Sequence, residues 1–206
     1  GLSKIYEFIW EEFCDWYIEL VKPRLYDREA KDRLEAMFVL NEVLKKAMKL
    51  LHPFMPFITE EIYSHLITDD ESILISSWPE YTNDILYPEE EKLMSFLMDA
   101  IRGIRNIRAE MNVPAAKKAK AFFVVKEQDI CDLVEKEKST FNRLAGLSDI
   151  IIKSDKSGIP QDAVAVVVEG AEIFIPLEEL IDLKKEIERL EKEKANLEME
   201  LDRVNK

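Results

Sequence analysis

The sequence predicts a mainly α-helical protein, in which an antiparallel helical bundle leads into a small α+β connector and then into one strand of a coiled-coil arm. Three observations support this fold class. Apolar side chains in the first 112 residues recur at the three- and four-residue spacing of amphipathic helices. Short apolar runs bounded by turn residues replace that spacing between residues 121 and 176, and a heptad pattern fills residues 180–204. We therefore expect domains at residues 1–116, 117–177 and 178–206.

Four helices are expected in the bundle, at residues 2–21, at 27–51, from about residue 56 onward, and at 88–112. Because proline lacks a backbone N–H, Pro23 is expected to end the first helix and Pro114 to close the last. Asp27 is a suitable N-cap for the second helix. Between the third and fourth helices, residues 72–79 are expected to run extended, with Trp78 filling the end of the core.

The connector is expected to contain a helix at residues 128–144 and four short strands, at residues 121–126, 149–153, 163–169 and 172–176. Gly170 lies between the last two strands and predicts a tight hairpin there. A unit of about 60 residues is small for an independent domain, so we expect it to pack against its neighbours.

The tail carries a heptad seam with one lysine at a core position. Its members are Leu180, Leu183, Ile187, Leu190, Lys194, Leu197, Leu201 and Val204. A single helix cannot bury such a seam, so we expect a partner helix that this sequence does not contain. A structural coiled-coil module that self-associates is the rival hypothesis, although a core lysine such as Lys194 weakens a homodimer.

The composition argues against several functions. A net charge of −13 is inconsistent with a protein that coats DNA or an anionic membrane with its whole surface. No apolar run reaches the roughly 20 residues of a membrane span, so we expect a cytoplasmic protein with no membrane partner. Cys14 and Cys131 lie far apart and form no CxxC pair, so we expect free thiols and no zinc site.

No pattern of residues indicates an active site. His52 and His65 have no histidine, cysteine or carboxylate pair at ligand spacing. Glu60 and Glu61 are adjacent, so on a helix their side chains diverge by about 100°. A glycine-rich phosphate loop and a nucleophile elbow are both missing. We therefore expect no catalytic residue, no metal ligand and no cofactor-binding residue in this chain.

A local cluster of cations stands out against the acidic background. Three arginines, Arg102, Arg105 and Arg108, are followed by Lys117, Lys118 and Lys120. On a helical wheel with Ile101 at zero, the arginines lie at about 100°, 40° and 340°, so they move from the edge of the apolar face into its middle. Such a cluster in an acidic protein indicates an anionic partner, and nucleic acid is the first candidate.

Arg108 admits two interpretations. Its position in the apolar face predicts a buried guanidinium, which would need a partner such as the carboxylate of Asp15, an acid surrounded by aromatic residues. Alternatively, the bundle opens at this end and all three arginines face a phosphate backbone. The sequence leaves both interpretations open.

Several segments together resemble the C-terminal region of the valyl-tRNA synthetases, which are class I aminoacyl-tRNA synthetases. These segments read FCDWYIE (13–19), KPRLY (22–26), LHPFMPFITEEIY (51–63), SWP (77–79) and IRNIRAEMNVP (104–114). The second half of the resemblance is the heptad tail, because valine enzymes end in an antiparallel helical arm. The equivalent region of an isoleucine or leucine enzyme is the alternative.

The resemblance implies an enzyme that activates valine with ATP and transfers it to its tRNA, acting as a monomer. The motifs of the catalytic and editing domains do not occur in this chain, which would therefore bind valine tRNA and do no chemistry. It also implies that the bundle meets the anticodon stem-loop and the arm meets the outer corner of the tRNA. We expect Arg102, Arg105, Lys117, Lys118 and Lys120 to contact phosphates, with a strong dependence on salt.

Overall fold

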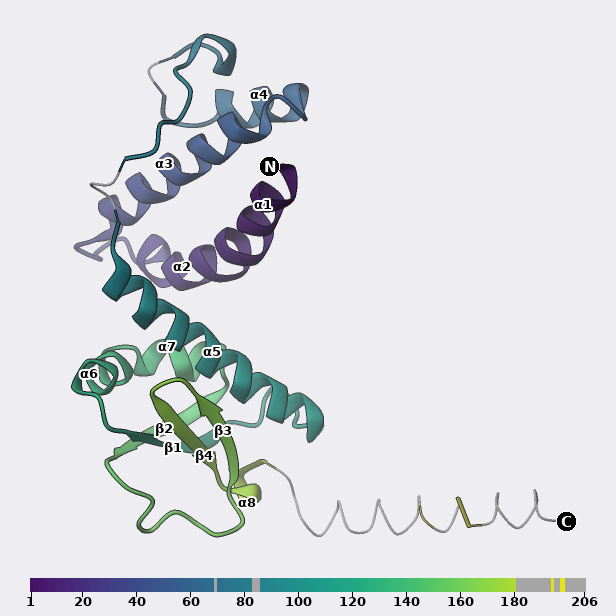
Figure 1. Ribbon diagram of the computed structural model, residues 1–206, viewed down its shortest axis with the longest axis vertical. Coiled ribbons are helices and arrows are strands. Elements are labelled where there is room, and N and C mark those ends of the chain that lie inside the picture. The colour runs from purple at the N-terminus through teal and green to yellow at the C-terminus, as the bar shows by residue number, and fades with distance from the viewer. Residues whose placement is uncertain (69, 83–85, 181–193, 195–196, 199–206) are drawn as a thin grey trace, which may run out of the picture. The chain divides into compact units, whose positions relative to one another are not determined.

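The computed structural model describes residues 1–68, 70–82, 86–180, 194, 197 and 198 (Figure 1). The chain forms two compact units, Gly1–Leu86 and Tyr87–Lys206. The first is helical, and the second combines helices with a four-stranded sheet. The predicted fold class, mainly α-helical with a small α+β part, is confirmed.

The first unit begins with three helical segments in direct succession. These are α1 (Leu2–Glu7), the π-helix η1 (Phe8–Ile18) and α2 (Glu19–Tyr26). After them come α3 (Arg33–Leu51), α4 (Pro56–Ser64) and the short 3-10 helix η2 (Ile73–Ile75). Its core is centred on Ala47, Met48, Tyr63 and Ile73. The predicted helix start at Pro56 is confirmed, because a proline is well suited to the first helical turn.

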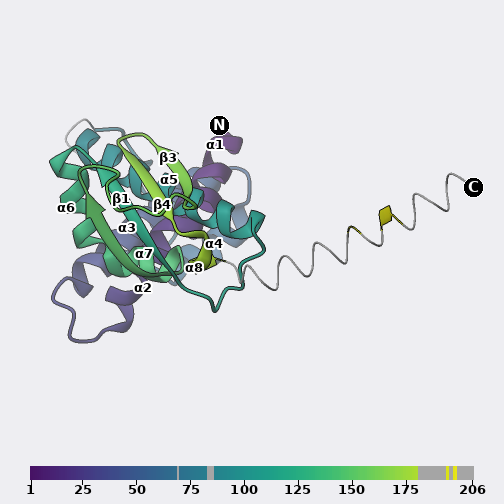
Figure 2. The ribbon, with the colours of Figure 1, turned by 90° about the horizontal axis from the view of Figure 1, so that it is seen from below.

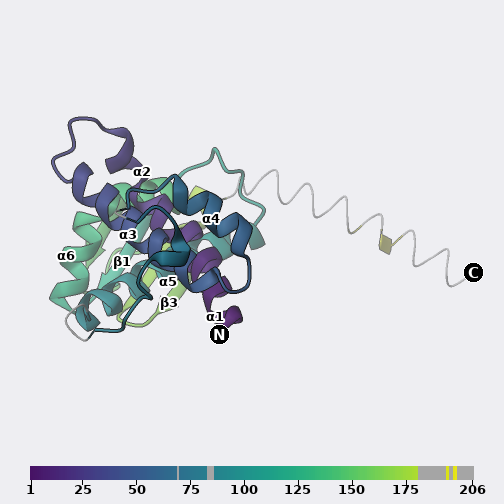
Figure 3. The ribbon, with the colours of Figure 1, turned by 90° about the horizontal axis from the view of Figure 1, so that it is seen from above.

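Two predictions about the first unit's helix boundaries are wrong. Pro23 lies inside α2, which continues to Tyr26, and the backbone N–H of Asp27 closes the last turn on the Pro23 carbonyl at 3.1 Å. Asp27 does not cap α3. Its carboxylate instead accepts a hydrogen bond from the Glu29 backbone N–H at 2.9 Å, which stabilises an Asx turn. Residues 27–32 therefore form an open loop between α2 and α3 (Figure 3).

Trp78 also differs from its prediction. The indole is 57% exposed and does not fill the end of a core. Residues 77–79 carry no helix or strand, and Lys49 of α3 donates a hydrogen bond to the Ser77 carbonyl at 3.1 Å. This attachment through the neighbouring backbone leaves the Trp78 ring at the surface.

The second unit starts with α5 (Pro88–Glu110) and continues into the sheet. Its further elements are β1 (Ala119–Val125), α6 (Gln128–Lys136), α7 (Lys138–Leu144), β2 (Leu147–Lys153), β3 (Val164–Val168), β4 (Ala171–Ile175) and α8 (Leu177–Leu180). All four predicted strands and the hairpin at Gly170, where φ is 90°, are present. The helix predicted for residues 128–144 is divided at Glu137 into α6 and α7.

The strand order is β2-β1-β4-β3. β1 pairs with β2 in parallel through the α6–α7 crossover, and β4 pairs antiparallel with both β1 and β3. Phe123, Ile173 and Val166 are neighbours in register, so they share one face of the sheet. Phe123 meets Phe141 of α7 edge to face at 5.1 Å between ring centroids.

That same face also receives α5. A Cβ built on Gly103 would lie 2.3 Å from Cγ1 of Val166, so only glycine allows α5 to approach β3 this closely. Figure 1 shows α5, α6 and α7 gathered on this side of the strands. The sequence predicted a domain boundary after residue 116, just beyond the end of α5. The compact units instead divide after Leu86, because α5 packs on the sheet and belongs to the second unit.

The heptad tail lies mostly outside the described residues. Of its predicted seam, the structure describes Leu180, Lys194 and Leu197. Leu180 is fully buried at the end of α8. Nζ of Lys194 lies 3.9 Å from Oε1 of Glu198, four residues further on. The predicted partner helix and the predicted self-association stay predictions.

Candidate nucleic-acid interface

The C-terminal half of α5 carries the three arginines that the sequence singled out, and they have different environments. Arg102 is exposed, and its Nη1 atom lies 3.3 Å from Oδ1 of Asp99, one turn earlier. Arg105 is also exposed, and its Nε–H donates to the Leu144 carbonyl at 2.7 Å. Arg105 therefore links α5 to the last turn of α7, where the carbonyls of a helix end attract a cation.

Arg108 is the buried member, with 8% of its surface exposed. Its guanidinium donates to the carbonyls of Gly146 at 3.3 Å, Pro114 at 3.3 Å and Lys117 at 2.6 Å. Burial lowers the pKa of this guanidinium below its ordinary value. An arginine begins from such a high pKa that the group stays charged at neutral pH.

The prediction that Arg108 points into the apolar face is confirmed, whereas the pairing with Asp15, which lies in the other compact unit, stays a prediction. Within its own unit, the acceptors of the guanidinium are carbonyl oxygens. Several carbonyl dipoles can stabilise a buried cation because each presents a partial negative charge. Backbone acceptors carry no sequence signature, so helical spacing could identify the buried arginine without identifying its partners.

Gly146 completes this arrangement, although no sequence pattern pointed to it. Its φ is 69°, in the left-handed region that favours glycine. A Cβ at this position would lie 3.1 Å from Cζ of Arg108, so the guanidinium packs directly against the glycine. A glycine that follows a helix is a common C-terminal signal, which could have predicted the backbone conformation but not the contact.

The end of α5 is fixed by its own backbone. Asn112 has a φ of 52°, the Asn112 N–H donates to the Ala109 carbonyl at 3.0 Å, and the Val113 N–H donates to the Arg108 carbonyl at 2.8 Å. These two bonds are a Schellman motif, in which a left-handed residue satisfies the last carbonyls of a helix. Pro114 follows, as the prediction of a helix end there required.

The predicted lysines lie directly after this helix end. The Lys117 N–H donates to the Pro114 carbonyl at 3.0 Å, and the Lys117 carbonyl is the shortest contact of Arg108. Lys117 is half-buried, Lys118 is exposed, and Lys120 is half-buried on β1, opposite Asp149 of β2. Arg108 thus holds the lysine loop against the arginine-bearing end of α5.

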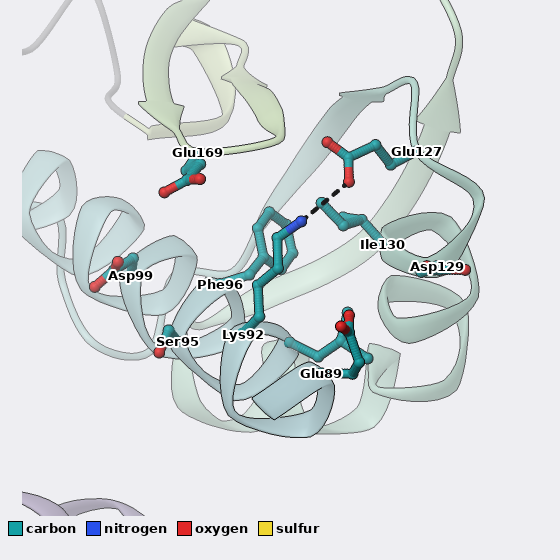
Figure 4. A pocket seen from close by; sticks show the side chains of 10 residues that line it. Glu89, Lys92, Ser95, Phe96, Asp99, Glu127, Asp129, Ile130 and Glu169 are labelled. Atoms are coloured by element: carbon teal, nitrogen blue, oxygen red, sulfur yellow. Dashed lines mark hydrogen bonds and ion pairs between the residues drawn. The ribbon is translucent and has the colours of Figure 1, made fainter. Parts of the chain in front are cut away.

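The N-terminal half of α5 has the opposite character. A cavity of about 110 Å³ there is lined by five carboxylates and one lysine (Figure 4). The acids are Glu89, Asp99, Glu127, Asp129 and Glu169. Lys92 extends toward Glu127, with 3.5 Å between Nζ and Oε2 (Figure 4). An anionic ligand would be repelled here, so the cations at the other end of the helix are the better phosphate site.

Within the described part of the chain, no three histidine, cysteine or acidic side chains are arranged to hold a metal ion. Cys14 and Cys131 are free and half-buried. His52 contacts Thr59 at 2.8 Å between Nδ1 and Oγ1, next to the first turn of α4. None of the helices that the structure describes combines the length and apolarity of a membrane span.

The cationic end of α5 is thus the candidate nucleic-acid interface, and comparison with known proteins identifies the family of the chain. Residues 1–123 match the family model described as the anticodon-binding domain of tRNA ligase. The chain belongs to this family.

Three relatives that align with almost the whole chain are valine–tRNA ligases. The chain is 47% identical over 206 residues to the valine–tRNA ligase of Clostridium perfringens, and 46% identical over 204 residues to that of Clostridium acetobutylicum. It is 44% identical over 202 residues to the valine–tRNA ligase of Carboxydothermus hydrogenoformans. These alignments cover 98–100% of the chain but about 23% of each relative, so the chain spans about a quarter of their length.

Proposed function

We propose that this chain is the tRNA-docking part of a valine–tRNA ligase. The whole enzyme would activate valine with ATP and attach it to valine tRNA in the cytoplasm, using catalytic and editing domains outside this sequence. The part described here would bind tRNA and perform no chemistry. Its partners would be the tRNA and those other domains.

The observation that supports this proposal is the cationic end of α5. In a chain with a net charge of −13, Arg102 and Arg105 lie in the C-terminal half of α5, Lys117 and Lys118 lie in the loop after it, and Lys120 follows on β1. Arg108 ties the helix to the lysine loop through the Lys117 carbonyl at 2.6 Å. Because the lysine loop is already held against α5, its cations can contact phosphates without the entropy cost of ordering the loop on binding.

Arg105 and Arg108 are unsuitable for a direct test, because both also donate hydrogen bonds to backbone carbonyls and their removal would change the fold as well. The test therefore changes Arg102 and Lys118, which are exposed. Binding of a valine tRNA transcript is measured across salt for the unchanged chain and for Arg102→Gln/Lys118→Gln. Each phosphate contact contributes about 0.7–0.9 to the slope of log affinity against log salt, so we expect the double variant to lower the slope by about 1.5.

Lys92→Gln is the matched control, since it removes one cation from the same helix at its acidic end. We expect it to leave the salt slope unchanged. No binding of the transcript at low salt would refute docking by this chain. An unchanged slope in the double variant, with binding retained, would move the phosphate contacts to other residues.

A further inference from the structure

The face of the sheet opposite α5 and α7 carries a row of apolar side chains that have no role in the proposed phosphate contacts. Phe122 of β1 and Phe174 of β4 are direct partners on the two central strands. Ile151 of β2 lies beside Phe122, and Ala165 of β3 lies beside Phe174. The next residue on each central strand points to the other face, which is the core, and there Phe123 and Ile173 are fully buried. Figure 2 shows the molecule from below, with β1, β3 and β4 labelled.

This second face is partly exposed, although Val124, two residues after Phe122, is buried on it. Val167, which shares it with Phe174 by the alternation of the strands, is 75% exposed, and Ala165 is exposed. Both phenylalanines are partly exposed, whereas their neighbours Phe123 and Ile173 are not. Two aromatic rings side by side on the central strands of an otherwise half-open sheet are unusual for a surface that contacts only water.

Each ring has a lysine ammonium above it. Nζ of Lys153 lies 5.5 Å from the centroid of Phe122, and Nζ of Lys156 lies 5.5 Å from the centroid of Phe174. A cation in this position indicates that the ring presents its π-face outward rather than its edge. A planar group can therefore stack on either ring once the flexible lysine swings aside.

Cations on and next to this face can contact a phosphate-bearing partner. Lys120 precedes Phe122 by two residues and so lies on the same face, where it continues the cations of Lys117 and Lys118 onto the sheet. Two acids temper this charge: Asp149 lies opposite Lys120, and Glu172 pairs with Lys156 at 2.6 Å. Asp155 also lies close to Lys153, so acids and lysines are equal in number here, and the excess of positive charge comes from Lys117 and Lys118 in the preceding loop.

We propose that this face is a stacking platform for unpaired nucleotides of RNA, in which Phe122 and Phe174 each receive a base while Lys120, Lys153 and Lys156 contact the phosphates. This platform adds a second RNA contact to the proposed function. It rests on that function only in identifying the RNA as a tRNA. Exposed aromatic rings combined with cations are the general means of binding single strands, because every base has a π-face. The bases inside a duplex cannot use the rings, since they already stack on one another.

The test compares two probes with the same number of phosphates, a short oligouridine and a blunt RNA duplex. We expect Phe122→Leu and Phe174→Leu each to weaken oligouridine binding by about fivefold or more, and to leave duplex binding unchanged. Leucine keeps an apolar contact for the lysine stems, so the phosphate contacts persist. Phe57→Leu, at a 90% exposed phenylalanine of the first unit, is the matched control and should change neither affinity.

Phe122→Trp keeps the π-face and should retain oligouridine binding, which separates loss of stacking from a damaged fold. An equal loss of oligouridine and duplex binding in the leucine variants would overturn the platform, as would oligouridine binding that ignores both rings. If the valine tRNA transcript binds while the rings have no effect, the proposed function stands without the platform. If oligouridine binding depends on the rings but the transcript does not bind, the platform stands and tRNA docking fails.

Discussion

The two halves of α5 lie on one helix but use charge in different ways. The first half begins with Glu89, Glu90 and Glu91, and it lines the acidic cavity. The second half carries Arg102, Arg105 and Arg108. Acids at the start of a helix and bases at its end both suit the helix dipole. The dipole therefore explains the direction of this polarity.

Burial separates the two halves more sharply than the sign of the charge. At the acidic end, Lys92 and Glu127 lie 3.5 Å apart with more than half of each side chain exposed, and such pairs contribute little stability. At the basic end, the buried guanidinium of Arg108 donates to three carbonyls. Among the charged groups of α5, Arg108 at the basic end therefore stabilises the fold, while the Lys92–Glu127 pair at the acidic end mainly sets the local charge.

The largest expected effect comes from Arg108→Met, which keeps an apolar stem but takes the donor away from the Lys117 carbonyl and one of two donors away from the carbonyls of Pro114 and Gly146. We expect the free energy of unfolding to fall by about 3 kcal/mol. Urea unfolding followed by circular dichroism measures it. The matched variant Arg102→Met, at an exposed position on the same helix, should change stability by less than about 0.5 kcal/mol. Equal effects of the two variants would remove the distinction between them.

Gly103→Ala tests whether the close approach of α5 to β3 is needed for stability. The new Cβ would lie 2.3 Å from Cγ1 of Val166, so something must shift, and we expect a loss of about 2 kcal/mol. The second change Val166→Ala removes the clashing methyl groups. The double variant should therefore be less destabilised than the sum of the two single variants. Simple additivity would contradict the contact.

A matched pair of glycines isolates the packing of Arg108. Gly146 and Gly158 both have a φ of 69°, so alanine should cost about 1 kcal/mol of backbone strain at either site. At Gly158 the new Cβ meets only the flexible end of Lys153, at 3.3 Å. At Gly146 it meets the held guanidinium of Arg108 at 3.1 Å, so thermal unfolding should show a larger loss there. The difference should disappear when both are measured in the Arg108→Met background.

The smallest effect is expected at the border between the two halves. Asp99 pairs with Arg102 at 3.3 Å, and both side chains are at least half exposed. Asp99→Asn should change stability by less than about 0.5 kcal/mol. Because it removes a carboxylate beside a proposed phosphate contact, we expect tRNA affinity at low salt to rise about twofold. A fall in affinity would show that Asp99 orients Arg102 for the phosphate.

Much of the fold follows from local patterns. The helix at 88–112, the four strands and the hairpin at Gly170 were predictable because periodicity, prolines and one glycine act within a few residues of themselves. The errors at Pro23 and Asp27 arose where a local signal competed with the continuing helix or with an Asx turn. Trp78 was misplaced because its exposure depends on the path of the chain after η2.

The candidate site divides in the same way. The sequence alone determined that Arg108 enters the apolar face, because a helix repeats every 3.6 residues, and that α5 ends next to a group of lysines. Only the tertiary structure decided that Arg108 bonds to the carbonyls of Pro114, Lys117 and Gly146, and that Phe122 meets Phe174. These partners are 6 to 52 residues apart along the chain, and every residue has a carbonyl. Only the packing of α5 and the register of the sheet select which groups meet.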